Sequence, residues 1–286
     1  MCSSDLDRAQ HYYVPQPSHW MIFGSAALFC VATGAASWLN GWEPGRYIVF
    51  AGLAILAFMM ARWFGDVVRE SEGGKYGRWE DVSFRWGMSW FIFSEVMFFA
   101  AFFGALYYAR LIAVPDLGSL DNKLLWPDFA AQWPTAGPVF KDPFTPMAAW
   151  GIPAINTLLL LSSGVTVTVA HWALKEGKRA QLALFMFFTV ALGVTFLCLQ
   201  AYEYGHAYSE LNLKLSTGVY GSTFFMLTGF HGFHVTVGTL MLTVILARCL
   251  AGHFKPENHF AFEAVAWYWH FVDVVWLGLF IFVYWL

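Results

Sequence analysis

The sequence has 286 residues, of which 58% are hydrophobic and only 12% are charged, with a formal net charge of −3. A water-soluble domain of this length carries far more charge, so the composition indicates an integral membrane protein. No cluster of basic residues is typical of a nucleic-acid interface, so nucleic acid is excluded as a partner. The four cysteines have no paired spacing, which predicts free thiols.

Seven long apolar runs, taken in chain order, predict seven membrane-spanning helices. The expected helices lie within residues 20–39, 46–64, 84–110, 148–174, 180–202, 215–247 and 263–285. The sequence shows no internal repeat and no water-soluble domain. It therefore predicts an all-α membrane protein.

The polar stretches between these runs predict the domain organisation. The expected parts are a cytoplasmic N-terminal segment at 1–18, helices 1 and 2 at 19–64, a cytoplasmic loop at 65–83, and a five-helix bundle (helices 3–7) at 84–286. Within this bundle, residues 113–146 form a long extracytoplasmic loop that contains six prolines. A loop of this length is expected to be an ordered cap on the membrane surface.

The distribution of lysine and arginine predicts how the chain crosses the membrane. With the N-terminus inside, the outer side keeps only Arg46, Arg110, Lys123, Lys141 and Lys214, and the inner side holds the other eleven of the 16 basic residues. Cytoplasmic segments of membrane proteins carry the excess of such residues. We therefore expect a cytoplasmic N-terminus and a periplasmic C-terminus.

Glu95 is the only charged residue between positions 86 and 109. A helix of that length reaches about 36 Å and crosses a hydrocarbon core of about 30 Å, which places Glu95 near the midplane. A carboxylate there is costly unless it is neutral, paired or hydrated. We expect other helices to supply its partners. A proton path or ligand site and a purely structural hydrogen bond both remain open for this residue.

Four further polar residues lie inside the last two predicted helices. His231 and His234 are separated by three positions, as are His270 and Asp273, so each pair shares one helix face. We interpret them mainly as a structural intramembrane polar network, because each imidazole can donate to a backbone carbonyl or to Asp273. A bis-imidazole haem needs histidines facing each other across the bundle, and a zinc or copper site needs a further ligand at matching depth. The sequence predicts no metal and no haem.

The most specific motifs occur in the last two predicted helices, GVYGSTFFMLTGFHGFHVTVGT at 218–239 and HFAFEAVAWYWHFVDVVWL at 259–277. Further motifs are INTLLLLSSGVTVTVAHWAL at 155–174, LQAYEY at 199–204, SEVMFF at 94–99 and DVVRES at 66–71. Through these motifs, nearly the whole chain resembles subunit III of aa3-type cytochrome c oxidases.

The resemblance implies that helices 1 and 2 are separated from helices 3–7 by a V-shaped cleft filled with lipid. It also implies an accessory subunit with no catalytic residue and no haem or copper of its own. Such a subunit contacts subunit I, shares the complex with subunit II, supports proton uptake, stabilises the catalytic subunit and binds structural phospholipid. The long loop at 113–146 favours a bacterial enzyme of the inner membrane.

The resemblance also implies roles for individual residues. Glu95, within SEVMFF, matches the family's buried carboxylate near the cleft. The implied lipid-binding residues are Trp63, Arg69, Glu70, Arg248 and His253. A guanidinium suits this role because its paired N–H groups bind phosphate.

Two other functions are compatible with the residues alone. A proton-coupled transporter would use Glu95 and Asp273, although transporters of this kind usually contain repeats and broken helices. A haem-carrying membrane cytochrome would absorb visible light as the isolated chain. The resemblance favours the oxidase subunit over both.

Overall fold

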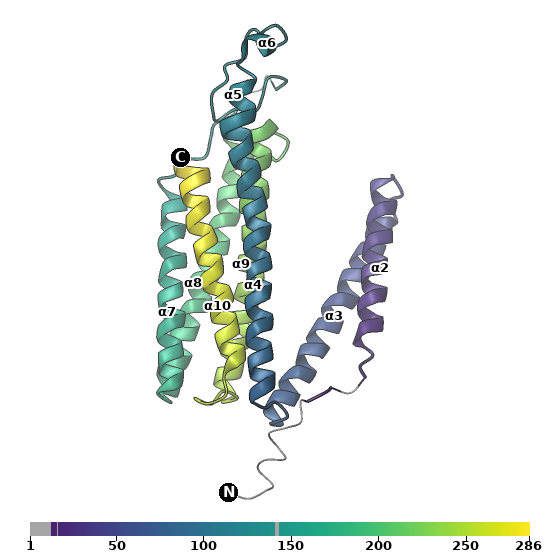
Figure 1. Ribbon diagram of the computed structural model, residues 1–286, viewed down its shortest axis with the longest axis vertical. Helices are drawn as coiled ribbons and strands as arrows, with labels where there is room; N and C mark the ends of the chain where they lie inside the picture. The colour runs from purple at the N-terminus through teal and green to yellow at the C-terminus, as the bar shows by residue number, and fades with distance from the viewer. Residues whose placement is uncertain (1–12, 16, 141–142) are drawn as a thin grey trace, which may run out of the picture. The chain divides into compact units, whose positions relative to one another are not determined.

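The computed structural model describes residues 13–15, 17–140 and 143–286, and this part of the chain contains helices and loops without a β-strand. Seven of its helices are long and apolar enough to cross a membrane (Figure 1). The prediction of an all-α membrane protein with seven spans is therefore confirmed. The chain divides into two compact units, Met1–Phe84 and Arg85–Leu286. Most of the predicted N-terminal segment lies outside the described residues.

The first unit is built on an antiparallel pair of helices, α2 (Trp20–Leu39) and α3 (Gly45–Glu72). Glycines let their backbones touch: a Cβ at Gly34 would lie 2.8 Å from the Val49 nitrogen, and one at Gly52 would lie 2.8 Å from the Ala27 oxygen. Lipid offers little hydrophobic drive for helix association, so such close contact supplies the attraction.

The stretch at 65–83, expected to be a polar loop or a short surface helix, is largely helical. Helix α3 continues through the charged residues to Glu72, and α4 (Arg78–Tyr108) begins six residues earlier than expected. The Arg69 guanidinium binds the Asp66 carboxylate one turn away, which supports the helix beyond its apolar run. The chain turns at Gly74, whose φ of +66° favours glycine.

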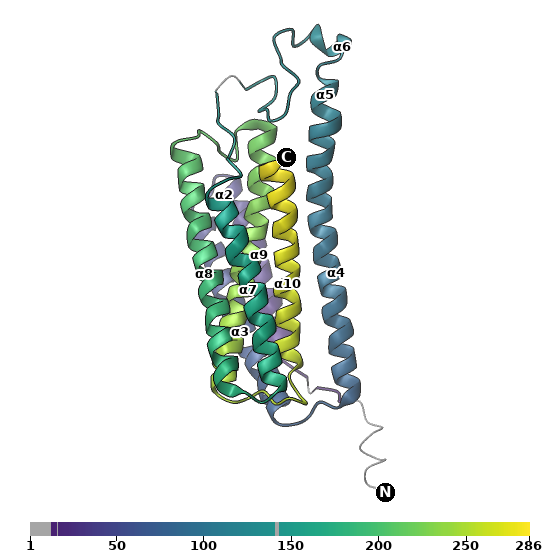
Figure 2. The same cartoon turned by 90° about the vertical axis from the view of Figure 1, so that its left-hand side faces the viewer.

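The second unit contains the remaining spans, and Figure 2 shows α7 to α10 side by side. These helices are α7 (Ile152–Lys175), α8 (Arg179–Ser209), α9 (Gly218–Leu250) and α10 (Phe260–Leu279), which continues as the π-helix η2 (Phe280–Trp285). Helix α4 leads into η1 (Ala109–Ala113), and the expected loop at 113–146 includes α5 (Val114–Asp116) and α6 (Leu120–Lys123). Helix α8 extends seven residues beyond its predicted end at 202.

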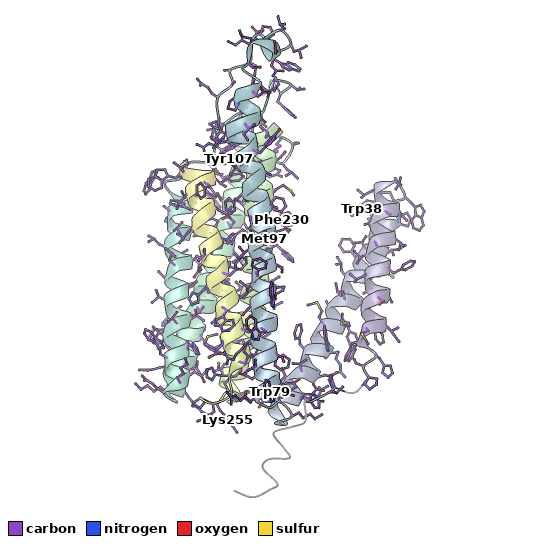
Figure 3. The ribbon with its side chains drawn as sticks, in the orientation of Figure 1. Trp38, Trp79, Met97, Tyr107, Phe230 and Lys255 are labelled. Carbon is purple, nitrogen blue, oxygen red and sulfur yellow. The ribbon has the colours of Figure 1, made fainter. Side chains whose placement is uncertain are left out.

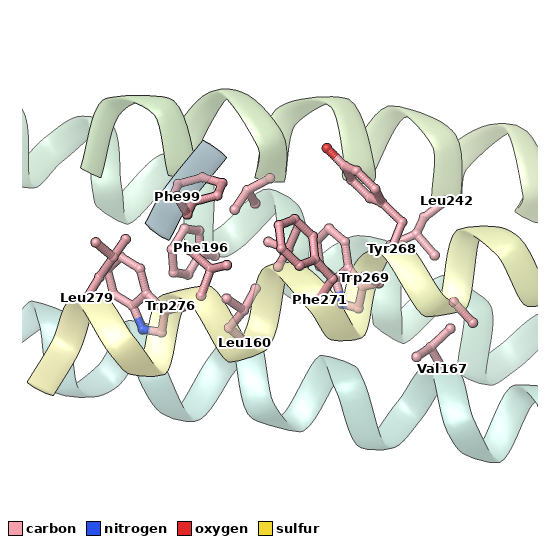
Figure 4. Close-up of a cluster of buried hydrophobic side chains, with 14 of the residues drawn as sticks. Phe99, Leu160, Val167, Phe196, Leu242, Tyr268, Trp269, Phe271, Trp276 and Leu279 are labelled. Atoms are coloured by element: carbon pink, nitrogen blue, oxygen red, sulfur yellow. The ribbon is translucent and has the colours of Figure 1, made fainter. Parts of the chain in front are cut away.

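Trp269 on α10 lies at the centre of the core and is 0% exposed (Figure 4). Its indole nitrogen donates a hydrogen bond of 2.8 Å to Ser163 Oγ on α7. Its ring occupies the space that Gly193 on α8 and Gly238 on α9 leave open, because a Cβ at these positions would lie 3.0 Å and 2.8 Å from ring carbons. One side chain therefore joins four helices.

Helix α4 is attached to α9 and α10 by aromatic rings. The ring of Phe98 lies 5.0 Å from that of Phe230, and the ring of Phe99 lies 6.0 Å from that of Phe271, as measured between centroids. Phe230 is labelled in Figure 3. A Cβ at Gly104 of α4 would meet nothing within 4 Å, so α4 does not use this glycine for close helix contact.

Candidate functional site

Glu95 on α4 and His234 on α9 form a hydrogen-bonded pair inside the second unit. Glu95 Oε2 lies 2.8 Å from His234 Nε2, and the two side chains are 21% and 10% exposed. His234 Nδ1 lies 2.6 Å from the carbonyl oxygen of Phe230, so Nδ1 carries a hydrogen and donates it there. A proton must then lie between Nε2 and the carboxylate oxygen, on one or the other. The pair therefore holds one shared proton.

Aromatic rings surround the imidazole of His234. The ring centroids of Phe99, Phe233 and Phe98 lie 5.0, 5.7 and 6.0 Å from its own, and that of Tyr268 lies 6.4 Å away. These rings present few polar groups, which lowers the local dielectric and strengthens the hydrogen bond to Glu95.

His231 points into the core three positions before His234. It is 1% exposed, and its ring centroid lies 5.1 Å from that of Trp276 and 5.9 Å from that of Phe196. Neither ring nitrogen has a hydrogen-bond partner within the described residues. The expected network therefore does not extend through His231.

His270 and Asp273 lie along a groove of about 460 Å³ formed by α7 and α10. His270 Nε2 lies 3.2 Å from Thr168 Oγ1, and its Nδ1 lies 3.8 Å from Asp273 Oδ2. No hydrogen bond in the described part of the chain joins this pair to His231 or His234. The predicted four-residue network thus separates into different local sites, because the residues face different helices.

A further buried carboxylate, Glu203 on α8, was not expected from the sequence, which placed it in the loop after the fifth helix. It is 1% exposed and accepts a hydrogen bond of 2.8 Å from the Tyr284 hydroxyl. Asn156 donates to Gln200 over 3.5 Å nearby. Gln200 precedes Glu203 by three positions, and this shared polar face was the available signal.

Three of the expected lipid-binding residues, Trp63, Arg69 and Glu70, line one pocket of about 580 Å³ in the first unit. Trp63 is exposed, and the Arg69 guanidinium binds the Asp66 carboxylate. Glu70 accepts a hydrogen bond of 2.8 Å from the Tyr76 hydroxyl. Burial, together with this hydrogen bond and the charge of Glu70, raises the pKa of the Tyr76 hydroxyl, so it remains a donor to Glu70.

The other two expected lipid-binding residues, Arg248 and His253, lie in the second unit. The guanidinium carbon of Arg248 lies 4.5 Å from the centre of the Phe254 ring, and the His253 backbone N–H donates to the Arg248 carbonyl over 3.1 Å. Phe254 thus orients the arginine at the end of α9.

Among the residues that the structure describes, one group could hold a metal ion. The ligand atoms of His171, His259 and Glu263 all lie within 4.8 Å of one another. The sequence does not reveal this cluster, because its residues come from the end of α7 and the start of α10, which are far apart in the chain.

These features define a class: a multi-pass α-helical membrane protein whose helices are joined by buried polar pairs.

A family model for cytochrome c oxidase subunit III matches residues 10–286. Relatives named cytochrome c oxidase subunit 3 extend the match: that of Latimeria chalumnae is 42% identical over 279 residues, covering 97% of this chain and 98% of the relative. That of Struthio camelus is 40% identical over 279 residues, with the same coverage. That of Dugong dugon is 42% identical over 275 residues, or 96% of each chain.

The chain belongs to the cytochrome c oxidase subunit III family. It is thus a multi-pass membrane subunit of an oxidoreductase complex, as the motifs of the last two helices predict.

Proposed function

We propose that this chain is the accessory, non-redox subunit of a proton-pumping cytochrome c oxidase that reduces oxygen to water. The family match over residues 10–286 carries the proposal. In the assembled enzyme the chain contacts subunit I directly and shares the complex with subunit II. Haem and copper belong to these partners, and this chain contributes no catalytic residue.

The pair formed by Glu95 and His234 supports a structural and proton-linked role. Each group satisfies the other at 2.8 Å, which offsets the cost of burying a carboxylate in the membrane. The pair also joins α4 to α9, and it keeps a proton inside the bundle. We infer that it stabilises the surface presented to subunit I and supports proton uptake there.

Phospholipid binding is the second part of the proposal. Trp63 and Arg69 are exposed in the last third of α3, and Arg248 lies at the C-terminal end of α9. A tryptophan beside a cation suits the level of lipid head groups, where the ring contacts acyl carbons and the guanidinium contacts phosphate.

The distribution of lysine and arginine supports an orientation with a cytoplasmic N-terminus and a periplasmic C-terminus. We propose the inner membrane of a bacterium as the location. Proteolysis of sealed inverted vesicles would test this orientation, since the loop before α4 would then be cleaved from outside.

The function is tested by measuring oxidase turnover over time in complexes purified with and without this chain. Removal should leave the haem spectrum and the initial rate nearly intact, while activity decays faster with each turnover. Loss of the haem spectrum or of the first turnover would mean that the chain holds a redox centre or an essential ligand, and the proposal would be wrong.

Lipid binding is tested by the double substitution Arg69→Ala and Arg248→Ala, with Arg46→Ala as a control at an exposed arginine of α3. The double variant should lose phospholipid, because two phosphate-binding groups are removed. Mass spectrometry of lipid extracted from the purified complex measures the ratio of phospholipid to protein. The same ratio in both variants would contradict the role.

A further inference from the structure

Three side chains meet where the end of α7 approaches the start of α10. His171 comes from α7, His259 is the N-cap residue of α10, and Glu263 lies in the first turn of α10. The rings of the two histidines are 5.2 Å apart between centroids. The side chains of His171, His259 and Glu263 are 20%, 9% and 12% exposed, so the cluster is enclosed but reachable from solvent.

Hydrogen bonding around this cluster leaves two nitrogen atoms without partners. His259 Nδ1 lies 3.2 Å from the Lys255 carbonyl oxygen, so this nitrogen carries a hydrogen and donates it. His259 Nε2 then faces Glu263 Oε1 at 3.2 Å, and His171 Nε2 faces the same oxygen at 3.5 Å. Both Nε2 atoms are buried and neither makes a hydrogen bond within the described residues. If His259 is neutral, its Nε2 carries a lone pair that faces the negatively charged Glu263 Oε1, and the two repel each other.

A cation between these atoms removes that conflict, and the spacing fits zinc. Zinc binds histidine nitrogen and carboxylate oxygen at about 2.0–2.2 Å in a tetrahedron, so neighbouring ligand atoms lie roughly 3.3–3.5 Å apart. The two observed nitrogen-to-oxygen distances of 3.2 and 3.5 Å correspond to this spacing. Magnesium and calcium prefer all-oxygen sites, which this cluster does not offer.

The groups behind the ligands also match a metal site. Histidine ligands usually donate their other ring N–H to a carbonyl or carboxylate, as His259 does to Lys255. Arg85 binds Glu263 through Oε2 and leaves Oε1 directed at the two histidines. Arg85 thereby orients the carboxylate, although its positive charge opposes a second cation.

We propose that His171, His259 and Glu263 bind one zinc ion, with water as the fourth ligand. The ion ties the end of α7 to the start of α10 and has no redox role. This proposal does not rest on the oxidase function, because the ligands all come from this chain.

The test uses the full chain purified in detergent, stripped with a chelator and titrated with zinc ion alone against a fluorescent zinc indicator. The wild-type chain should bind one equivalent that His171→Gln and His259→Gln each weaken by more than about 100-fold, since even an outer partner of a metal ligand contributes 10- to 100-fold. His206→Gln is the matched control, because His206 and Glu210 also form a histidine–carboxylate pair at 3.2 Å but lack a third ligand. This control should bind zinc as the wild type does.

Arg85→Gln is expected to change zinc affinity in the opposite direction from the histidine substitutions. Removing the guanidinium removes a competing positive charge, so zinc should bind more tightly than in the wild-type chain. Cobalt ion serves as a second probe, because tetrahedral cobalt absorbs visible light and this band should be lost in His259→Gln.

Equal zinc binding by His259→Gln and His206→Gln would overturn the proposal, as would a wild-type chain that takes up no zinc. The second result would assign the cluster to protonated histidines paired with Glu263. Circular dichroism shows whether the variants fold. If they do not, zinc-edge X-ray absorption of the zinc-loaded wild-type chain decides: two imidazoles and one carboxylate support the site, and any other ligand set contradicts it.

Discussion

Replacing Gly238 with alanine tests whether Trp269 is fixed at the centre of the four-helix contact. The new Cβ would lie 2.8 Å from Cε3 and 2.9 Å from Cζ3 of the Trp269 ring. Carbon atoms in contact usually lie about 3.5–4.0 Å apart, so the ring or the helix must move by roughly 0.7–1 Å. The hydrogen bond to Ser163 and the close approach of Gly193 resist this movement.

The expected cost follows from a comparison with a second glycine of the same helix. A Cβ at Gly232 would meet nothing within 4 Å, so Gly232→Ala gains helix propensity without a clash. Both substitutions gain this helix propensity about equally. The difference between their free energies of unfolding therefore measures the cost of overpacking at Trp269. We expect Gly238→Ala to be less stable than Gly232→Ala by about 1–3 kcal/mol.

The assay is unfolding of the purified chain in mixed micelles by a denaturing detergent, followed by near-ultraviolet circular dichroism of the tryptophans. The free energies of unfolding of the two variants are compared under identical micelle composition. Equal free energies of unfolding would show that the Trp269 ring can move without cost. Trp269 would then not be fixed by its contacts with α7, α8 and α9.

Two further substitutions address the buried carboxylates. Tyr284→Phe removes the donor to Glu203 and should lower the free energy of unfolding in the same assay by about 1–3 kcal/mol, so wild-type stability would contradict the burial described for this carboxylate. Glu95→Gln keeps a group able to bond His234 and should retain most of the initial turnover of the assembled oxidase. Normal assembly with complete loss of turnover would indicate a catalytic role instead.

The seven spans were predictable because an apolar run of sufficient length has few alternatives in a membrane protein. The ends of the helices were not. Hydropathy marks where the hydrocarbon ends, whereas α3, α4 and α8 continue through charged residues as long as backbone hydrogen bonds and side-chain pairs support them. Asp66 and Arg69 illustrate this, since their pairing lies beyond the apolar run, in a charged stretch expected to be a polar loop or a short surface helix.

The candidate site was predictable only in part. The cost of a midplane charge indicates that Glu95 needs a partner, but the choice of His234 depends on the rotation of α9 against α4, which no local pattern records. Glu203 was missed because a charged residue near the end of an apolar run resembles an interfacial one until Tyr284 covers it. The lipid-binding roles of Arg69 and Arg248 came from family resemblance and remain predictions.

The pairing of Glu95 with His234 has a consequence for biosynthesis, because the two residues are 139 positions apart. At about 5–20 residues per second, His234 is made roughly 7–28 s after Glu95. A charged residue at the centre of an inserting helix costs about 2.5–3.5 kcal/mol. The seven phenylalanines of α4, at about −0.3 to −0.6 kcal/mol each, together offset roughly 2–4 kcal/mol of this. Several of these phenylalanines, among them Phe98 and Phe99, later hold α4 against α9 and α10, so the same rings first help to carry an unpartnered carboxylate into the bilayer.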